Sequence, residues 1–248
     1  MPDLSPVRRR RVDAQLARRG IQDRYVMAAM GKVPREAFVA VALEEFAYAD
    51  APLPIGEEQS ISQPYVVALM IEAAAVRPGD RVLEVGAGSG YAAAVLSQIA
   101  TAVYAIERHP SLVEAAGARF ARLGYDNLEI RVGDGTLGWA PAAPFDAILV
   151  SAGGPKIPLV LKQQLAIGGR LVIPVGASER RQNLLRLTRT GEAAFEEENL
   201  GSVKFVPLIG KGGWPEGGGP EDRPRRRVRI AEAARADRRS GRSLARLQ

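Results

Sequence analysis

The sequence predicts an α/β fold with a doubly wound, mostly parallel sheet, and three observations support that class. An apolar, β-branched run at 81–86 ends in alternating glycines and passes into the strong helix former at 92–96; strand, tight turn and helix open a nucleotide-type domain. Strand-like and helical patterns then alternate as far as residue 175, which is typical of parallel sheets. The 248 residues, 46% of them hydrophobic, suffice for one sizeable core and not for a second full domain.

The first part of the chain is predicted to be helical. Apolar residues recur at helical spacing through 8–30, and Gly20 interrupts them, so we expect two helices around that glycine. A further helix is expected at 33–39, because Pro34 occupies a favoured early position.

A non-helical segment follows. Residues 48–55 contain Pro52 and Pro54, which predicts an irregular, rigid strap. It leads into a polar loop at 56–65 and a helix at 66–75. Small polar residues beside a proline suit a loop that faces a ligand, although most such loops carry no function.

The α/β core occupies the middle of the chain. Strands are expected at 81–86, 102–107, 128–132, 145–151 and 169–175, and helices at 90–100, 110–123 and 157–166. Two later strand-like segments, 183–189 and 202–209, have no long helix between them. They predict an antiparallel pair that closes one edge of the sheet.

The glycine turn indicates the class of ligand. Gly86, Gly88 and Gly90 are spaced G-x-G-x-G, which differs from the G-x-G-x-x-G of dinucleotide binders, and Glu84 precedes them. This arrangement suits S-adenosyl-L-methionine, which has no pyrophosphate but carries an ammonium group for a carboxylate. We therefore predict a class I S-adenosylmethionine-dependent methyltransferase, with other Rossmann-like folds as the alternative for this motif alone.

Three acids follow successive predicted strands. Glu84 precedes the glycine turn, Glu107 ends the second strand and Asp134 follows the third. Ligands of such sheets bind outside the carboxyl ends of the strands. An acid at the position of Glu107 can pair with ribose hydroxyls, and Asp134 could accept from an adenine amine. Each acid alone is more simply a solvated strand end or a helix cap, but together they predict a nucleoside pocket.

Composition excludes several kinds of chemistry. The chain has no cysteine and one histidine, His109, so disulfides, a thiolate nucleophile and a His-rich metal centre are excluded and no metal is expected. No run approaches the length of a membrane span, and no apolar segment follows the N-terminal arginines. We expect a soluble, cytoplasmic protein that has no membrane partner.

The net charge of +6 lies in one segment. Residues 221–248 hold ten arginines and four acids, which leaves 24 basic and 24 acidic residues in 1–220. A glycine-rich stretch precedes this tail, so 211–248 is predicted to be a flexible linker and an arginine-rich extension. Its charge predicts weak electrostatic contacts with acidic partners.

Several segments together resemble the protein-L-isoaspartate (D-aspartate) O-methyltransferase family, over roughly residues 10–210. The resemblance is carried by 33–39 (VPREAFV), 52–56 (PLPIG), 59–64 (QSISQP), 83–91 (LEVGAGSGY), 133–135 (GDG), 145–148 (FDAI), 164–176 and 203–208. Many methyltransferases share the glycine turn, whereas the loop at 59–64 indicates this family. Its second position is usually threonine and here is Ser60, which retains a hydroxyl.

The resemblance implies a set of site residues and a domain layout. It makes Ser62 the catalytic residue. It assigns cofactor contacts to Ser60, Ile61, Glu84, Gly86, Gly88, Gly90, Glu107, Arg108, Asp134 and Gly135, and substrate contacts to Pro54, Ile55, Gln59 and Val206. Residues 1–210 are expected to form a single methyltransferase domain, with N-terminal helices and the substrate loop in 1–78 and the cofactor-binding core in 79–210.

The implied reaction is protein repair. The family transfers a methyl group from S-adenosyl-L-methionine to the free α-carboxylate of L-isoaspartyl and D-aspartyl residues in damaged proteins and peptides. The ester then closes to a succinimide, and hydrolysis returns some normal aspartyl linkage. Two alternatives stay open. The first is a class I methyltransferase acting on a small molecule or on RNA, and the neutral body argues against RNA. The second is a binding protein that acts through its arginine-rich tail.

Overall fold

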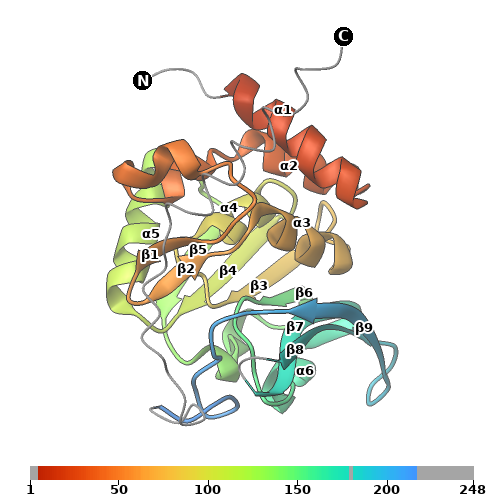
Figure 1. Ribbon diagram of the computed structural model, residues 1–248. Coiled ribbons are helices and arrows are strands. Elements are labelled where there is room, and N and C mark those ends of the chain that lie inside the picture. The colour runs from red at the N-terminus through yellow and green to blue at the C-terminus, as the bar shows by residue number, and fades with distance from the viewer. Residues whose placement is uncertain (1–4, 179–180, 217–248) are drawn as a thin grey trace.

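A seven-stranded sheet forms the centre of the protein (Figure 1), in a computed structural model that describes residues 5–178 and 181–216. The strand order is β5-β4-β3-β6-β7-β8-β9. The strands are β3 (Arg81–Val85), β4 (Ala102–Glu107), β5 (Leu128–Val132), β6 (Phe145–Val150), β7 (Leu165–Ser178), β8 (Arg181–Arg189) and β9 (Phe195–Val203). The first five of the order pair in parallel, and β8 and β9 add antiparallel. The predicted fold class is confirmed.

Both faces of the sheet are buried. Alternate residues of β3 enter different cores, since Val82 belongs to one apolar cluster and Leu83 to the other. The larger cluster also contains residues of α1 (Ser5–Leu16), α2 (Arg24–Lys32), α3 (Pro64–Ala73), α4 (Tyr91–Ser97) and α5 (Pro110–Leu123). The smaller one is covered by α6 (Leu159–Gln163) and the short turns at 135–142. Because nearly every side chain of the central strands β3 and β6 is buried, these strands have the continuous apolar runs by which they were predicted.

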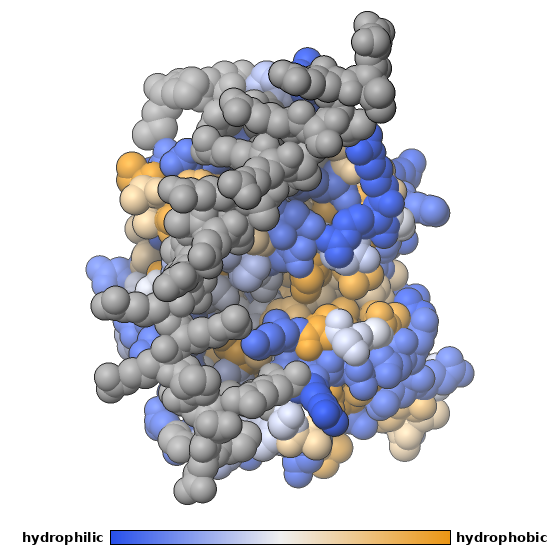
Figure 2. All heavy atoms as spheres, in the orientation of Figure 1, coloured by the Kyte–Doolittle hydropathy of each residue, from blue (hydrophilic) through white to orange (hydrophobic). Residues whose placement is uncertain are grey.

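The outer surface contrasts with these two cores. Figure 2 shows mostly hydrophilic residues on the face turned toward the viewer, with hydrophobic ones gathered near its centre. Within the described ranges, no helix has both the length and the apolar character needed to cross a membrane.

The N-terminal helices form as predicted on either side of Gly20, whose φ is 93°. Asp23 caps α2, because its carboxylate accepts the backbone N–H groups of Tyr25 and Val26. The helix expected at 33–39 is instead a four-residue 3₁₀ turn, Arg35–Phe38. It ends there because Val39 takes an extended backbone and is buried beside Phe38.

The segment predicted as a strap and a polar loop is a hairpin. Strand β1 (Leu53–Gly56) pairs antiparallel with β2 (Gln59–Ile61), and this two-stranded sheet is separate from the main one. Glu57 and Glu58 form the turn with φ of 50° and 56°. Hairpin turns with two positive φ angles favour Asn-Gly or Asp-Gly, so two glutamates gave no sequence signal. Pro54 is tolerated because the strand has a free edge.

The late strands differ from the prediction in position. The antiparallel edge is confirmed, but its outer strand is β9 at 195–203 and not 202–209. Strand β9 is polar and mostly exposed, whereas Leu208, in the apolar segment after it, is buried without belonging to a strand. In this part of the chain, the apolar residues therefore indicate which segment is buried and not which segment forms a strand. The helix expected at 157–166 is also shorter, because Leu165 already starts β7.

A strap at 208–216, here the C-terminal strap, folds back over the carboxyl ends of the strands. Ile209 bridges to Trp214, and the Trp214 indole N–H donates to the carbonyl of Gly153 (3.0 Å). The sequence placed 211–216 in the flexible linker, and the structure packs these residues instead. Gly213 lies so close to the Leu208 carbonyl that a side chain would collide with it, so the glycine permits close packing. The arginine-rich tail lies outside the described residues.

Candidate active site

The glycine turn joins β3 to α4 with a backbone that requires glycine. Gly86, Gly88 and Gly90 have φ of 83°, 55° and 85°. A Cβ on Gly90 would lie 2.5 Å from the Phe120 ring of α5. The turn therefore brings its backbone close to the sheet end and keeps side chains out of the space above it.

Glu107 holds that turn against β4. Its buried carboxylate accepts the Gly88 N–H at 2.9 Å and, through the other oxygen, the N–H groups of Arg108 (2.7 Å) and His109 (3.0 Å). Each oxygen of a carboxylate has two lone pairs. Glu107 therefore keeps acceptor capacity for a ligand hydroxyl while it fixes the loop.

Glu84 is buried with one oxygen unused. The Ser151 hydroxyl donates to Glu84 Oε1 at 3.3 Å, while Oε2 is enclosed and has no hydrogen-bond partner among the described residues. Burial raises the pKa of the Glu84 carboxyl to about 8; the bond from Ser151 opposes this rise and the charge of Glu107 adds to it. A buried acceptor without a donor favours a ligand that brings a cation or an N–H group.

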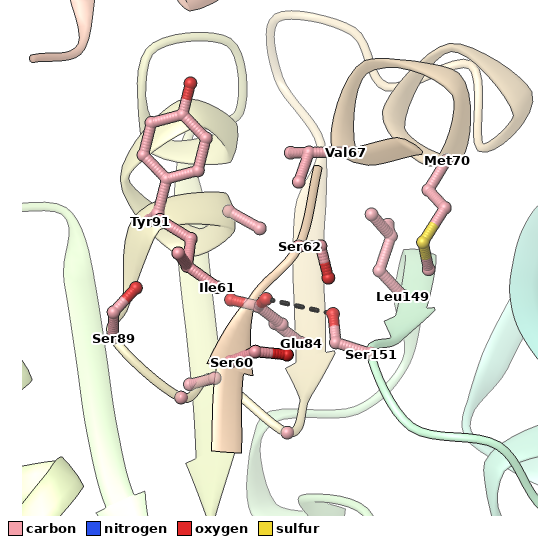
Figure 3. A pocket seen from close by; sticks show the side chains of 14 residues that line it. Ser60, Ile61, Ser62, Val67, Met70, Glu84, Ser89, Tyr91, Leu149 and Ser151 are labelled. Carbon is pink, nitrogen blue, oxygen red and sulfur yellow. Dashed lines mark hydrogen bonds between the residues drawn. The ribbon is translucent and has the colours of Figure 1, made fainter. Parts of the chain in front are cut away.

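The hairpin closes the pocket over Glu84. Figure 3 shows Ser60, Ile61 and Ser62 on one wall, with the Ser62 and Ser151 hydroxyls turned toward the space beside the Glu84 carboxyl. The remaining lining residues are Val67, Met70, Gly86, Ala87, Gly88, Ser89, Tyr91, Ala92 and Leu149. Six of the predicted site residues thus meet in one pocket: Ser60, Ile61, Ser62, Glu84, Gly86 and Gly88.

Ile55 and the hairpin turn reach over the other end of the glycine turn. A Cβ on Gly88 would lie 3.1 Å from Ile55 Cδ1. At the start of α5, the Ser111 hydroxyl donates to Glu57 Oε1 at 2.6 Å, so the turn of the hairpin rests on that helix (Figure 1). The hairpin is therefore attached beside the part of the pocket that the glycine turn forms.

Asp134 is already occupied by groups of the chain. Its Oδ1 accepts the N–H and hydroxyl of Thr136, and its Oδ2 accepts the Lys211 N–H of the C-terminal strap at 2.8 Å. Burial acts to raise the pKa of Asp134, but these hydrogen bonds outweigh it and lower the pKa below its ordinary value. Gly135 packs so tightly on Val85 that a side chain could not fit.

The remaining predicted site residues lie around this pocket and not in its wall. Arg108 forms an ion pair with Glu216 of the C-terminal strap (2.6 Å). Pro54 is exposed on β1, and the Gln59 amide donates to the Glu57 carbonyl. The Val206 carbonyl accepts the N–H of Gly153, just beyond β6.

Comparison with known proteins identifies the family. A profile of the protein-L-isoaspartate(D-aspartate) O-methyltransferase (PCMT) family matches residues 8–213. The chain belongs to this family. Its protein-L-isoaspartate O-methyltransferase relatives include those of Methylorubrum extorquens (strain PA1), 61% identical over 84% of this chain and 91% of the relative, and of Rhodopseudomonas palustris (strain ATCC BAA-98 / CGA009), 57% identical over 83% and 94%.

Solved structures agree with that membership. One protein-L-isoaspartate O-methyltransferase superposes with a TM-score of 0.74 at 29% identity, over 83% of this chain and 67% of the other. A putative one from Plasmodium falciparum, in complex with S-adenosyl-L-homocysteine, gives 0.71 at 27% identity over 82% and 98%. The family and the class I methyltransferase fold are those that the sequence predicted, and the cofactor prediction is supported by the same findings.

The residues present fit the methyl donor of this family. The unpartnered Oε2 of Glu84 can accept the ammonium of the methionine moiety, and the glycine turn leaves room for the ligand next to it. Among the described residues, no group of three His, Asp or Glu side chains could hold a metal ion.

Sequence reasoning missed Ser151, which is the only side chain seen to donate to Glu84 within the described part of the chain. A signal was available. Ser151 directly follows β6, so it sits at the carboxyl end of a fourth parallel strand, where ligands of such sheets bind. Acids at such strand ends are recognisable by their charge, whereas the neutral hydroxyl of a serine is not.

Proposed function

We propose that this chain transfers a methyl group from S-adenosyl-L-methionine to the free α-carboxylate of L-isoaspartyl and D-aspartyl residues in damaged proteins. One observation carries the proposal: the family's hairpin loop places Ser62 in the same pocket as Glu84 and the glycine turn. Family membership over 8–213 supports it. Residues 1–210, together with the C-terminal strap, would act as one catalytic domain.

The cofactor would be held by the carboxyl ends of β3, β4 and β5. Glu84 would receive the ammonium, Glu107 the ribose hydroxyls and Asp134 the adenine amine, with the glycine turn beneath. Bound S-adenosyl-L-methionine supplies the activated methyl group. Asp134 already accepts hydrogen bonds from Thr136 and Lys211, so an adenine amine would share oxygens that the C-terminal strap uses.

The acceptor side needs orientation more than a base. A carboxylate is already ionised at neutral pH, so no residue has to remove a proton. What is required is placement in line with the methyl group and removal of water from the nucleophilic oxygen. Ser62 would orient the carboxylate by donating a hydrogen bond. Neutral hydroxyls suit this role, because a fixed negative charge beside the acceptor would repel it.

The deciding experiment is methyl transfer to a synthetic isoaspartyl peptide, with the aspartyl peptide of the same sequence as control. The expected result is methylation of the first peptide and none of the second. Transfer to both peptides, or to neither while RNA or a small molecule is methylated, would reject the proposed substrate.

We further propose that the arginine-rich tail adds salt-sensitive attraction for acidic protein substrates. All the formal net charge lies in 221–248, and exposed charges are screened beyond roughly 10 Å at 0.1 M salt. A chain ending at Glu216 should methylate a short neutral isoaspartyl peptide as the full chain does, and should lose rate only on acidic proteins at low salt. Equal rates on acidic proteins at all salt concentrations would reject this role. A cytoplasmic location stays a prediction, consistent with the absence of cysteine.

A further inference from the structure

Arg35 is a fully buried cation beside the pocket, at 0% exposure. Its guanidinium donates to three backbone carbonyls: those of Ala47, Ala51 (3.3 Å) and Ser62 (2.9 Å). No carboxylate forms an ion pair with it within the described residues. Family resemblance marks the segment around Arg35 but gives this side chain no role.

The three carbonyls belong to the two ends of one hairpin. Ala47 and Ala51 lie on the chain that leads into β1, and Ser62 directly follows β2. The planar fork of an arginine can bond several acceptors in a fixed geometry, so Arg35 joins the entrance of the hairpin to its exit. A parallel tie is made by Gln63, whose amide donates to the Asp50 carbonyl at 3.0 Å.

The other side of the Arg35 guanidinium faces Tyr91, next to the glycine turn. Its guanidinium carbon is 5.7 Å from the centre of the Tyr91 ring, and Phe38 packs edge-on against the same ring at 5.6 Å. Tyr91 starts α4 directly after the glycine turn and lines the pocket. Arg35 thus lies between the backbone of Ser62 and the first residue of the helix that follows the turn.

Keeping a cation in this position carries a cost. Burial lowers the pKa of Arg35, which the nearby Tyr91, Tyr48 and Asp50 only partly offset. An apolar side chain of similar volume would avoid that desolvation. It could not bond three carbonyls, however, and it would leave them buried without donors. The buried guanidinium therefore fixes the geometry of the hairpin, although an apolar side chain would be desolvated at a lower cost.

We infer that Arg35 is a positioning residue for methyl transfer, which holds Ser62 in register with the glycine turn so that the acceptor carboxylate is aligned. The inference rests on the proposed role of Ser62. A misplacement of about 1 Å at a reacting centre costs roughly 10²-fold in rate, so loss of this clamp should appear in turnover and not in cofactor binding.

The main test is Arg35→Lys, which keeps the charge and loses the fork. Turnover on the isoaspartyl peptide at saturating concentrations should fall by roughly 10- to 100-fold. The Kd for S-adenosyl-L-methionine should stay within about threefold, since Glu84 and Glu107 keep their partners. Hydrogen exchange should quicken in 53–63 and stay unchanged in β3 and β4. Normal turnover in the folded variant would overturn the inference.

A matched control separates positioning from stability. Tyr48→Phe removes the hydrogen bond that the Tyr48 hydroxyl donates to Glu36 and leaves in place the three backbone carbonyls that Arg35 bonds. It should lower Tm and leave turnover unchanged at temperatures where the protein is folded. If Tyr48→Phe lowers turnover as much as Arg35→Lys does at matched stability, Arg35 only stabilises the fold and the inference fails.

A double-mutant cycle with Ser62→Ala tests the route of the effect. If Arg35 acts through Ser62, Arg35→Lys should change turnover less than about twofold in the Ser62→Ala background, whereas full additivity would overturn the inference. If Ser62→Ala alone leaves turnover intact, it is the proposed role of Ser62 that fails. Should Arg35→Lys not fold, Gln63→Leu carries the test: turnover reduced a few-fold with unchanged cofactor Kd supports the clamp, and unchanged turnover refutes it.

Discussion

The two sides of the pocket are held in place by different means. On the cofactor side, Glu84 and Glu107 sit at the ends of β3 and β4, neighbours in the main sheet with continuous parallel register. On the acceptor side, Ser62 follows a hairpin that belongs to a separate two-stranded sheet and is tied by the side chains of Arg35 and Gln63. Many repeated backbone bonds define the first side and a few side-chain bonds the second. A substitution on the cofactor side should therefore affect only the contacts of the substituted residue. On the acceptor side, the position of Ser62 should depend on single side chains.

Ser62→Ala should give the largest effect and keep the two sides distinct. Loss of one orienting hydrogen-bond donor is expected to cut turnover by roughly 10²-fold, while cofactor affinity stays near that of the wild type. Turnover at saturation and calorimetric Kd for the cofactor measure the two quantities. A variant with weakened cofactor binding and normal turnover would show that Ser62 binds the cofactor and does not orient the acceptor.

Glu84→Gln should show how much the buried Glu84 carboxyl lowers the stability of the folded protein at high pH. The pKa of Glu84 is about 8 in the folded chain and 4.5 ordinarily, so between these pH values the folded state holds a proton that the unfolded state releases. The stability from this group is full below pH 4.5 and is lost as pH rises toward 8. Without ligand, the wild type should lose on the order of 3 kcal/mol relative to Glu84→Gln between about pH 5 and pH 8.

Urea unfolding at the two pH values measures that difference. The variant should be the more stable protein at pH 8 and the poorer binder of S-adenosyl-L-methionine, because the amide cannot neutralise an ammonium. Parallel pH dependence of the two proteins would mean that Glu84 is not held protonated in the empty pocket.

Glu107→Ala should weaken cofactor binding by about 1–3 kcal/mol, the usual penalty when hydrogen-bonded partners lose their acceptor. Turnover at saturating cofactor should change little, which would confirm that the effect stays on its own side. Glu129→Ala, an exposed acid on the neighbouring strand β5, serves as control for calorimetry. Equal Kd values for the two variants would remove Glu107 from the site.

The smallest effect is expected from Glu216→Ala. It removes the ion pair with Arg108, whose partners are 39% and 83% exposed, and such pairs contribute less than about 1 kcal/mol. The cofactor Kd should rise less than about fivefold, and the difference should fade at high salt. A larger, salt-independent loss would show that the C-terminal strap belongs to the cofactor side as firmly as the strands do.

The same contrast explains what the sequence could predict. Strands β3 to β6 and the acids at their ends follow from local runs and from the rule that ligands meet the carboxyl ends of parallel strands. The hairpin did not follow, because Glu57 and Glu58 take a turn that sequence preferences assign to Asn and Gly. Strand β9 was missed because exposed edge strands carry polar residues.

Two features of the site could not be predicted from the sequence and became apparent only in the folded chain. Arg35 is charged, so its sequence suggests exposure, and only three distant carbonyls account for its burial. Ser151 follows a correctly predicted strand, yet a serine gains meaning only when Glu84 lies within hydrogen-bond distance. Contacts between residues 27 or 67 positions apart leave no local pattern in a single sequence.

The C-terminal strap fixes where the rest of the chain departs. Its bonds to Asp134 and Arg108 anchor Glu216 at the edge of the cofactor side. In a chain cut at Glu216, a peptide fused there through a short flexible linker would have an effective concentration at the pocket in the millimolar range. The strap thus makes Glu216 an attachment point, where a fused peptide or domain could recruit substrates without a change to any residue of the active site.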